Sequence, residues 1–262
     1  MKGGIRILCD SEGHGATWGG AECRHKGWLC RGKCAINTSM AFIPNLVALP
    51  AAQRALWPEL RATPDTFTLY GGTALALRLG HRASLDFDFF SNASFDPDRL
   101  AQQVPYLRDA ERVQVAPNTL TCRVDRGGPV LVSFFGGLGL GQVAAAEQAD
   151  DTLLRVASLL DIAGTKAAVL QKRAEAKDYL DIDALLRHGI DLPAVLAAGM
   201  VVYGRKFNPL ITLKALSYFD DLPALPVEVR ARLSKAVEAV DATKLPALTP
   251  YQKRPGENGT TG

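Results

Sequence analysis

Short apolar runs alternate with turns in the first half of the chain, and apolar positions at helical spacing fill the second half. The predicted elements of the first half are strands at 67–72, 85–90, 118–124 and 129–135 and helices at 73–79 and 97–108. From about residue 152 to 243 the strand signals disappear, and Gly and Pro residues divide the sequence into four expected helices. We therefore expect an α+β protein, with a mixed sheet and helices over 40–150 and a helical domain over 151–245.

Both ends of the chain lack this periodicity. Apolar spacing begins abruptly at Met40, and the tail 246–262 is rich in Pro, Gly and Thr, which is typical of a disordered segment. Before Met40 stand Cys9, Cys23, Cys30 and Cys34. Zinc ligation is one interpretation, but thirteen, six and three residues separate these cysteines, which is not zinc-site spacing. We interpret residues 1–39 as a disordered leader or a mis-assigned start.

Composition places few limits on function. The 262 residues are 47% hydrophobic and 22% charged, which is ordinary for a globular protein. A net charge of +3 permits an anionic partner but is well below that of a dedicated nucleic-acid binder. No apolar run approaches the roughly 18 residues of a membrane span, and the start lacks a secretion signal. We expect a cytoplasmic protein with no membrane partner.

The run LDFDFF places two acids in an otherwise apolar strand. Residues two apart in a strand share a face, so Asp86 and Asp88 project together, whereas Leu85, Phe87 and Phe89 point to the core. Two adjacent carboxylates repel each other unless a cation lies between them. Mg²⁺ commonly takes one or two carboxylates and completes its coordination with substrate phosphates. The pair therefore indicates metal and phosphate chemistry.

A glycine pair precedes these acids. The strand FTLY runs into Gly71 and Gly72 and then into a predicted helix that begins at Thr73. Glycines let a phosphate approach the backbone, and the free N–H groups of a helix N-terminus can bind it. The Thr73 hydroxyl could add a further contact, although a glycine pair alone could equally be a tight turn.

The glycine pair, thirteen further residues and DFDF resemble the signature of the polymerase-beta-like nucleotidyltransferases. The two runs GGTALALRLGHRASLDFDFFS and KAAVLQKRAEAKDYLDIDALL resemble the AbiEii branch, the nucleotidyltransferase toxins of bacterial toxin–antitoxin and phage-defence systems. This resemblance implies a polymerase-beta-like domain followed by a helical domain, a bound nucleoside triphosphate (NTP) and two Mg²⁺ ions. It also implies an RNA acceptor, such as the 3′ end of tRNA, and a cognate antitoxin.

The second run predicts a charged helix stripe. If residues 166–181 form one helix, Lys166, Arg173 and Lys177 lie within an arc of roughly 40°, and Asp181 about 40° further round. On the far side lie Gln171, Glu175 and Asp178. Such a stripe can line a phosphate cleft. The alternative is a solvated face on which Lys177 and Asp181 form an intrahelical ion pair.

Two residues in the loop before the acidic strand, Arg82 and Ser84, could contact the triphosphate. The candidate catalytic residues are therefore Asp86, Asp88, Lys166 and Asp181. The candidate nucleotide-binding residues are Gly71, Gly72, Thr73, Arg82, Ser84, Arg173 and Lys177, and the candidate metal ligands are Asp86 and Asp88.

The chain departs from the resembled family at a third carboxylate. The family places this carboxylate on a later strand, where it helps to hold the metal and can accept a proton. Here the strand 129–135 has Ser133 at that position. A neutral hydroxyl cannot replace it, although Asp125, Asp178 or Asp181 could reach in.

Three functional classes follow. The first is a Mg²⁺-dependent nucleotidyltransferase that moves a nucleoside monophosphate (NMP) from an NTP to an acceptor hydroxyl. The second is a nucleotide-binding protein without turnover, because of Ser133. The third is an Asp-x-Asp phosphohydrolase, which needs a small or hydroxyl residue where Phe90 stands. We favour the first.

Overall fold

The computed structural model describes residues 24–25, 28–29 and 41–252, and the chain divides into two units, Met1–Ser39 and Met40–Gly262. In the first unit, β1 (Arg24–His25) and β2 (Trp28–Leu29) form an antiparallel pair. The four cysteines, and most of the leader expected over 1–39, lie outside the described residues. The second unit carries the predicted site.

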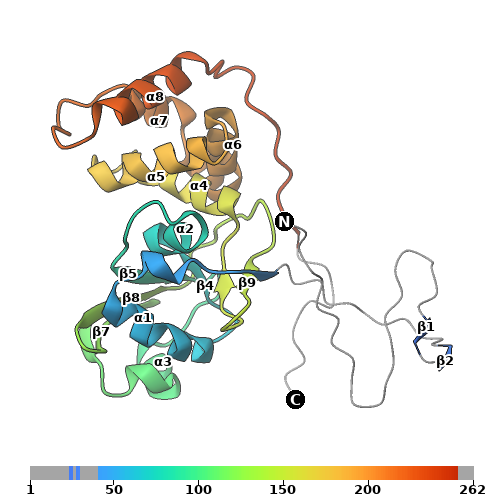
Figure 1. Ribbon diagram of the computed structural model, residues 1–262, viewed down its shortest axis with the longest axis vertical. Helices are drawn as coiled ribbons and strands as arrows, with labels where there is room; N and C mark the ends of the chain where they lie inside the picture. Colours follow the sequence, from blue (N-terminus) through green and yellow to red (C-terminus); the bar gives the residue numbers. More distant parts are fainter. Residues whose placement is uncertain (1–23, 26–27, 30–40, 253–262) are drawn as a thin grey trace. The chain divides into compact units, whose positions relative to one another are not determined.

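An eight-stranded mixed sheet forms the α/β half of the second unit (Figure 1). In spatial order its strands are β3 (Ala41–Phe42), β9 (Glu147–Ala149), β10 (Arg155–Val156), β4 (Thr68–Tyr70), β5 (Asp86–Phe90), β8 (Pro129–Phe135), β7 (Thr119–Asp125) and β6 (Glu111–Ala116). Strand β5 runs antiparallel to β4 and parallel to β8, so it lies inside the sheet. The α+β class expected from the sequence is confirmed.

The face of β5 opposite the two acids packs into the hydrophobic core. Phe87 and Phe89 alternate with the two acids along β5 and are fully buried. The ring of Phe89 stacks on Phe134 of β8, with centroids 5.1 Å apart, and Phe87 stacks on Trp57 at 6.3 Å. The core side thus fixes β5, and the acids face the other way, as the alternation predicts. Leu85, which we expected on the core side, precedes β5 and is exposed instead.

Short helices complete the α/β half. They are α1 (Ala51–Leu56), α2 (Gly71–Leu79), α3 (Pro97–Gln103) and 3-10 helices at Leu46–Ala48, Trp57–Ala62 and Pro105–Leu107. The helix expected over 97–108 is therefore interrupted at Val104, directly before Pro105, as the backbone restriction on a residue before proline explains.

Five helices and a 3-10 turn form the second half. They are α4 (Leu159–Val169), α5 (Ala176–Arg187), α6 (Leu192–Tyr203), the turn Gly204–Lys206, α7 (Pro209–Leu216) and α8 (Val227–Glu238). Figure 1 shows α2 between the sheet and helices α4 and α5, whereas α1 and α3 lie on the side away from them. Helices α4 and α6 pack closely at Gly164, which has no side chain. A Cβ atom there would lie only 2.8 Å from the backbone of Ala198.

One expectation about this half needs revision. The single helix expected through 166–181 is wrong, because the chain turns between α4 and α5, and no Gly or Pro marks the break. Within the expected tail the described residues 246–252 form neither helix nor strand, and N of Tyr251 donates to O of Gln142 at 2.7 Å. The division into domains at residue 150 and the disorder of the tail stay predictions.

Within the described part of the chain, no single helix has the length and apolar character of a membrane span. Only the segments Ala176–Arg187 and Leu192–Lys206 together reach that length, and they are bent by 117°.

Candidate functional site

The acids of β5 open into a cavity of about 420 Å³ between the sheet, α2 and α4, which we call the acid-pair cavity. Its lining residues are Gly71, Gly72, Arg82, Ala83, Ser84, Leu85, Asp86, Asp88, Phe90, Thr165, Lys166, Val169, Arg173, Lys177 and Tyr203. Asp86 is exposed and Asp88 is half-buried. Burial, and then the charge of Asp86, raise the pKa of Asp88 above its ordinary value. This carboxyl would gain from a cation beside it.

The glycine pair lies against the acids and against Arg82. Gly71 has a φ of +74°, which favours glycine, and a Cβ atom there would lie 2.6 Å from Oδ2 of Asp88. A Cβ atom on Gly72 would lie 2.5 Å from Nη2 of Arg82 and 3.0 Å from Oγ of Ser84. The start of α2 therefore brings bare backbone next to a carboxylate and a guanidinium, where a side chain would fill the space.

Lys166 reaches the same cavity from α4. The residue is only 6% exposed, and its Nζ lies 2.6 Å from Oδ2 of Asp181 and 3.4 Å from Oδ1 of Asp178. Both aspartates belong to α5, so the break after α4 lets one helix face the other. Lys166 is thus a buried cation held between two fully buried carboxylates.

Asp181 joins this lysine to the loop after α2. Nε and Nη2 of Arg82 bind its two oxygens at 2.7 and 2.9 Å, and Nε2 of His81 lies 2.7 Å from Oδ1. Burial alone would raise the pKa of Asp181, but the hydrogen bonds from His81 and Arg82 and the charge of Lys166 hold it well below its usual range. Asp181 does not line the cavity; it orients two cations that do.

Two more basic residues lie at the rim. Nε of Arg173 lies 3.0 Å from Oδ2 of Asp178, and Nζ of Lys177 lies 2.9 Å from Oε2 of Glu175. The far-side position expected for Asp178 is therefore wrong: it is buried and paired with Arg173 and Lys166. The intrahelical ion pair between Lys177 and Asp181 does not form either, because Lys177 pairs with Glu175 instead.

Most of the candidate residues thus meet in one place, with two exceptions. The cavity holds Gly71, Gly72, Arg82, Ser84, Asp86, Asp88, Lys166, Arg173 and Lys177. Thr73 and Asp181 are buried behind it. The Thr73 hydroxyl donates to the backbone oxygen of Asp86 at 2.5 Å, so it fixes the acidic strand and does not face the cavity.

Sequence reasoning missed the aromatic residues of this cavity. Phe90 shares the face of Asp86 and Asp88 by the same two-residue period, so its position could have been read from the strand. Tyr203 ends α6, far along the chain, and no sequence signal marks it.

Ser133 lies where the third carboxylate was expected. It is paired in register with Asp88 on the neighbouring strand, and Oγ1 of Thr121 donates to its hydroxyl at 3.1 Å. Asp125 stands four residue pairs away at the hairpin turn, where its Oδ1 accepts from N of Gly127. Asp178 and Asp181 are engaged by cations. Each substitute that the sequence offers therefore has another role.

The donor set of the cavity limits how a divalent metal could bind. Among the described residues no cluster of three or more Asp, Glu, His or Cys side chains could hold a metal ion. The pair Asp86 and Asp88 still fits Mg²⁺, which needs only one or two carboxylates when phosphate oxygens complete its coordination. The raised pKa of Asp88 supports this fit, because a partly buried carboxylate beside another acid gains from a cation.

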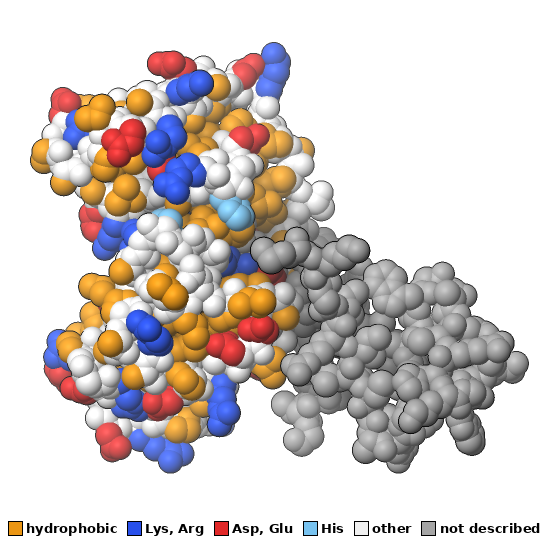
Figure 2. Space-filling model, viewed as in Figure 1, with side chains coloured by type: hydrophobic (Ala, Val, Ile, Leu, Met, Phe, Trp, Pro, Cys, Tyr) orange, Lys and Arg blue, Asp and Glu red, His pale blue; other side chains and the backbone are white. Residues whose placement is uncertain are grey.

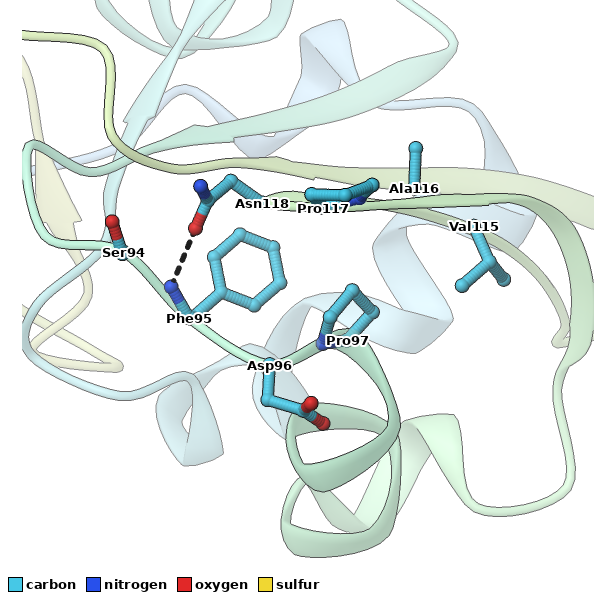
Figure 3. Close-up of a pocket in the computed structure, with 8 residues that line it drawn as sticks. All are labelled: Ser94, Phe95, Asp96, Pro97, Val115, Ala116, Pro117 and Asn118. Atoms are coloured by element: carbon cyan, nitrogen blue, oxygen red, sulfur yellow. Dashed lines mark hydrogen bonds between the residues drawn. The ribbon is translucent and has the colours of Figure 1, made fainter.

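A larger cavity of about 630 Å³ lies at the β6 edge of the sheet (Figure 3). It is lined by Ser94, Phe95, Asp96, Pro97, Val115, Ala116, Pro117 and Asn118. Its one charged lining residue, Asp96, accepts from N of Arg99 and caps α3. This larger cavity is lined by no basic residue and no pair of acids. The acid-pair cavity is therefore the candidate active site.

The fold is that of a nucleotidyltransferase, a mixed sheet followed by helices. The chain belongs to the AbiEii family, since residues 58–250 match the family model described as "Nucleotidyl transferase AbiEii toxin, Type IV TA system". The resemblance seen in the sequence is thereby confirmed.

Two further comparisons found similar proteins. The chain is 34% identical over 160 residues to an uncharacterized protein of Aquifex aeolicus (strain VF5). The aligned region covers 60% of this chain and 75% of that protein. MenT4, the nucleotidyltransferase toxin Rv2826c from Mycobacterium tuberculosis H37Rv, is similar in structure with a TM-score of 0.50. This similarity covers 73% of our chain and 83% of MenT4 at 18% identity, so it concerns the fold alone.

Proposed function

We propose that this protein is a Mg²⁺-dependent nucleotidyltransferase that moves an NMP from an NTP to a hydroxyl of an RNA, and that it acts as the toxin of a toxin–antitoxin or phage-defence pair. The acceptor that we favour is the 3′ end of tRNA. The toxin role follows from the family. NTPs and tRNA are cytoplasmic, so a cytoplasmic location is part of this proposal.

One observation carries the proposal: bare backbone, paired acids and a buried lysine face the same cavity. The backbone at Gly71 and Gly72 and the guanidinium of Arg82 would bind the triphosphate at the start of α2. Lys166 would add a positive charge that the surrounding aspartates keep in place. These groups position the phosphates, and positioning is the main task of a protein in phosphoryl transfer.

In the proposed reaction, the acceptor oxygen forms a bond to the α-phosphorus of the NTP while the bond to pyrophosphate breaks. Pyrophosphate leaves toward Arg82 and Lys166, which compensate its charge. Strand β8 offers no carboxylate for the hydroxyl proton, so the proton passes to water. Asp86 and Asp88 would hold Mg²⁺, which when bound supplies neutralisation of the phosphate oxygens near the reacting phosphorus.

A second candidate function is nucleotide binding without turnover. Ser133 beside Asp88 favours it, because a hydroxyl is a weak metal ligand and a poor base. The two functions share the cavity and differ in whether pyrophosphate is released.

The proposed function is tested by incubating the protein with each labelled NTP, Mg²⁺ and total tRNA. Labelled RNA and free pyrophosphate are expected, and Asp86→Asn/Asp88→Asn should abolish both. The matched control is Asp220→Asn/Asp221→Asn, an adjacent acid pair that is exposed and does not line the cavity. NTP binding without transfer would favour the second function, and label on another acceptor would replace RNA as the substrate.

The partners stay part of the proposal. In the space-filling view, acidic and basic side chains are interspersed over the described surface, with no patch of one sign on this face (Figure 2). Together with the net charge of only +3, this suggests that RNA binding would depend on the cavity and its basic rim, Arg173 and Lys177. An antitoxin is proposed on family grounds alone.

A further inference from the structure

We propose that the end of the acid-pair cavity formed by Phe90 and Tyr203 is a nucleobase site, where the base of the incoming nucleotide stacks on aromatic rings. This inference rests on the proposed function, because it names the part of the cavity that receives the nucleoside.

The cavity groups follow the chemical order of an NTP. At one end Gly72 lies against Arg82 and Ser84, and next to it Gly71 lies against Asp88. Phe90 follows Asp88 by two residues on the same face of β5, about 7 Å further along the strand at the usual rise per residue. Along the cavity, the candidate phosphate-binding groups come first, the acids proposed to hold the metal come next, and an aromatic ring comes last. An NTP has the same order, with the β- and γ-phosphates at one end, the α-phosphate next and the base at the other end.

The ring of Phe90 is held in place before any ligand arrives. It stacks on Tyr70 with centroids 4.9 Å apart and an interplanar angle of 16°, and Phe135 meets it edge-on at 5.8 Å. A ring fixed in this way loses little conformational freedom on binding. Phe90 nevertheless keeps part of its surface open to the cavity.

Tyr203 brings a second ring from the helical half. It is the last residue of α6, and the preceding Val202 accepts a hydrogen bond at 2.9 Å from N of Gly141. The neighbouring residues Leu140 and Gln142 line a second cavity of about 250 Å³ on the side of Phe90, which places the end of α6 at the aromatic end. Burial raises the pKa of Tyr203, so its phenol is neutral at neutral pH.

The end of the cavity at Phe90 and Tyr203 suits the base of the nucleotide better than its phosphates. The cations Arg82, Lys166, Arg173 and Lys177 serve a phosphate, whereas Phe90 and Tyr203 offer ring surface without charge. Every nucleobase has a π-face that can stack on such rings. Stacking would therefore hold the base of any NTP, and the choice among bases would fall to polar contacts.

The test compares a nucleotide with its phosphates alone. Binding of non-hydrolysable α,β-methylene NTPs and of inorganic tripolyphosphate is measured with Mg²⁺ for the full chain. The variants are Tyr203→Ala, Tyr203→Phe and Phe90→Leu, and the control is Tyr218→Ala, a half-exposed tyrosine outside the cavity. Tyr203→Ala and Phe90→Leu should weaken NTP binding about tenfold and leave tripolyphosphate binding unchanged, as loss of one stacking contact implies. Tyr203→Phe and Tyr218→Ala should bind both probes like the parent.

Different failures have different meanings. If Tyr203→Ala and Phe90→Leu bind NTP like the parent, the nucleobase site is overturned and the proposed function stands. Equal weakening of NTP and tripolyphosphate would overturn it too, because the rings would then only support the fold of the phosphate end. A parent that binds neither probe would overturn the proposed function together with this inference.

Discussion

At the scale of single residues, Gly71 and Gly127 both adopt a left-handed backbone conformation, but only Gly71 also leaves room for a neighbouring side chain. Their φ values are +74° and +76°, but only Gly71 has a neighbour within 4 Å of an added Cβ, namely Asp88. Gly127→Ala should lose about 1 to 2 kcal/mol of the free energy of unfolding, the cost of a left-handed L-residue, and Gly71→Ala at least as much. Only Gly71→Ala should also lose stabilisation by Mg²⁺, because the carboxylate of Asp88 must move. Thermal melts with and without Mg²⁺ check this, and an unchanged metal response in Gly71→Ala would contradict it.

The acid pair leads to a prediction about pH. Because the folded protein raises the pKa of Asp88, folding favours its protonated form. Without metal, the free energy of unfolding should therefore fall as pH rises from the ordinary value of 3.8 through the raised one. Asp86→Asn/Asp88→Asn should remove this dependence and be at least as stable as the parent.

Bound Mg²⁺ should turn the destabilising effect of the ionised acid pair on the fold into a stabilising one. At a hundredfold excess over its Kd, Mg²⁺ should stabilise the parent by about 2.7 kcal/mol and leave the Asn variant unchanged. The Asp220→Asn/Asp221→Asn control should respond like the parent. A metal-independent loss of about 3 to 5 kcal/mol in the cavity variant would show that the acids are structural partners of a buried cation and would falsify the metal-site hypothesis.

At the scale of elements, Asp181 connects α4, α5 and the loop after α2. Asp181→Asn should cost about 3 to 5 kcal/mol, because buried Lys166 and partly buried Arg82 lose their shared anion. The control Glu59→Gln removes an equally bidentate contact, to Arg126, that is partly exposed, and should cost less than about 1 kcal/mol. Urea unfolding measures both, and similar losses would contradict the positioning role.

The lowered pKa of Asp181 adds a pH signature to the same pair of variants. Its contribution is present above its unfolded pKa and is lost as pH falls through the lowered folded value. The difference in stability between parent and Asp181→Asn should therefore shrink only in strong acid.

The same elements show what a sequence can predict. Strand β5 and the start of α2 follow from local periodicity, so their residues meet as expected. Strand β6 was missed because it is short and all but one of its residues are exposed, so its alternation is limited to Val113 and Val115. The break between α4 and α5 was missed because it depends on tertiary pairing: Lys166 faces two aspartates across the turn. For the same reason, the burial of Thr73 and Asp181 could not be foreseen from helix geometry alone.

At the scale of the whole molecule, the division between Ser39 and Met40 coincides with the start of apolar periodicity. A chain that begins at Met40 should melt at the same temperature as the full chain, because the core that the described residues form lies within 41–252. Differential scanning calorimetry compares the two. Unfolding of the shorter chain, or stoichiometric zinc whose removal unfolds the full chain, would make the leader part of the folded protein.

The contact between Lys166 and Asp181 has a consequence for synthesis on the ribosome. The acids of β5 are translated almost a hundred residues before Asp181, the residue that aligns Arg82 and Lys166. A nascent chain that ends before α5 has the acid pair and the glycines but no anion to orient its cations. The cell would therefore meet a competent toxin only after the helical half has left the exit tunnel and docked, a delay during which an antitoxin can be made.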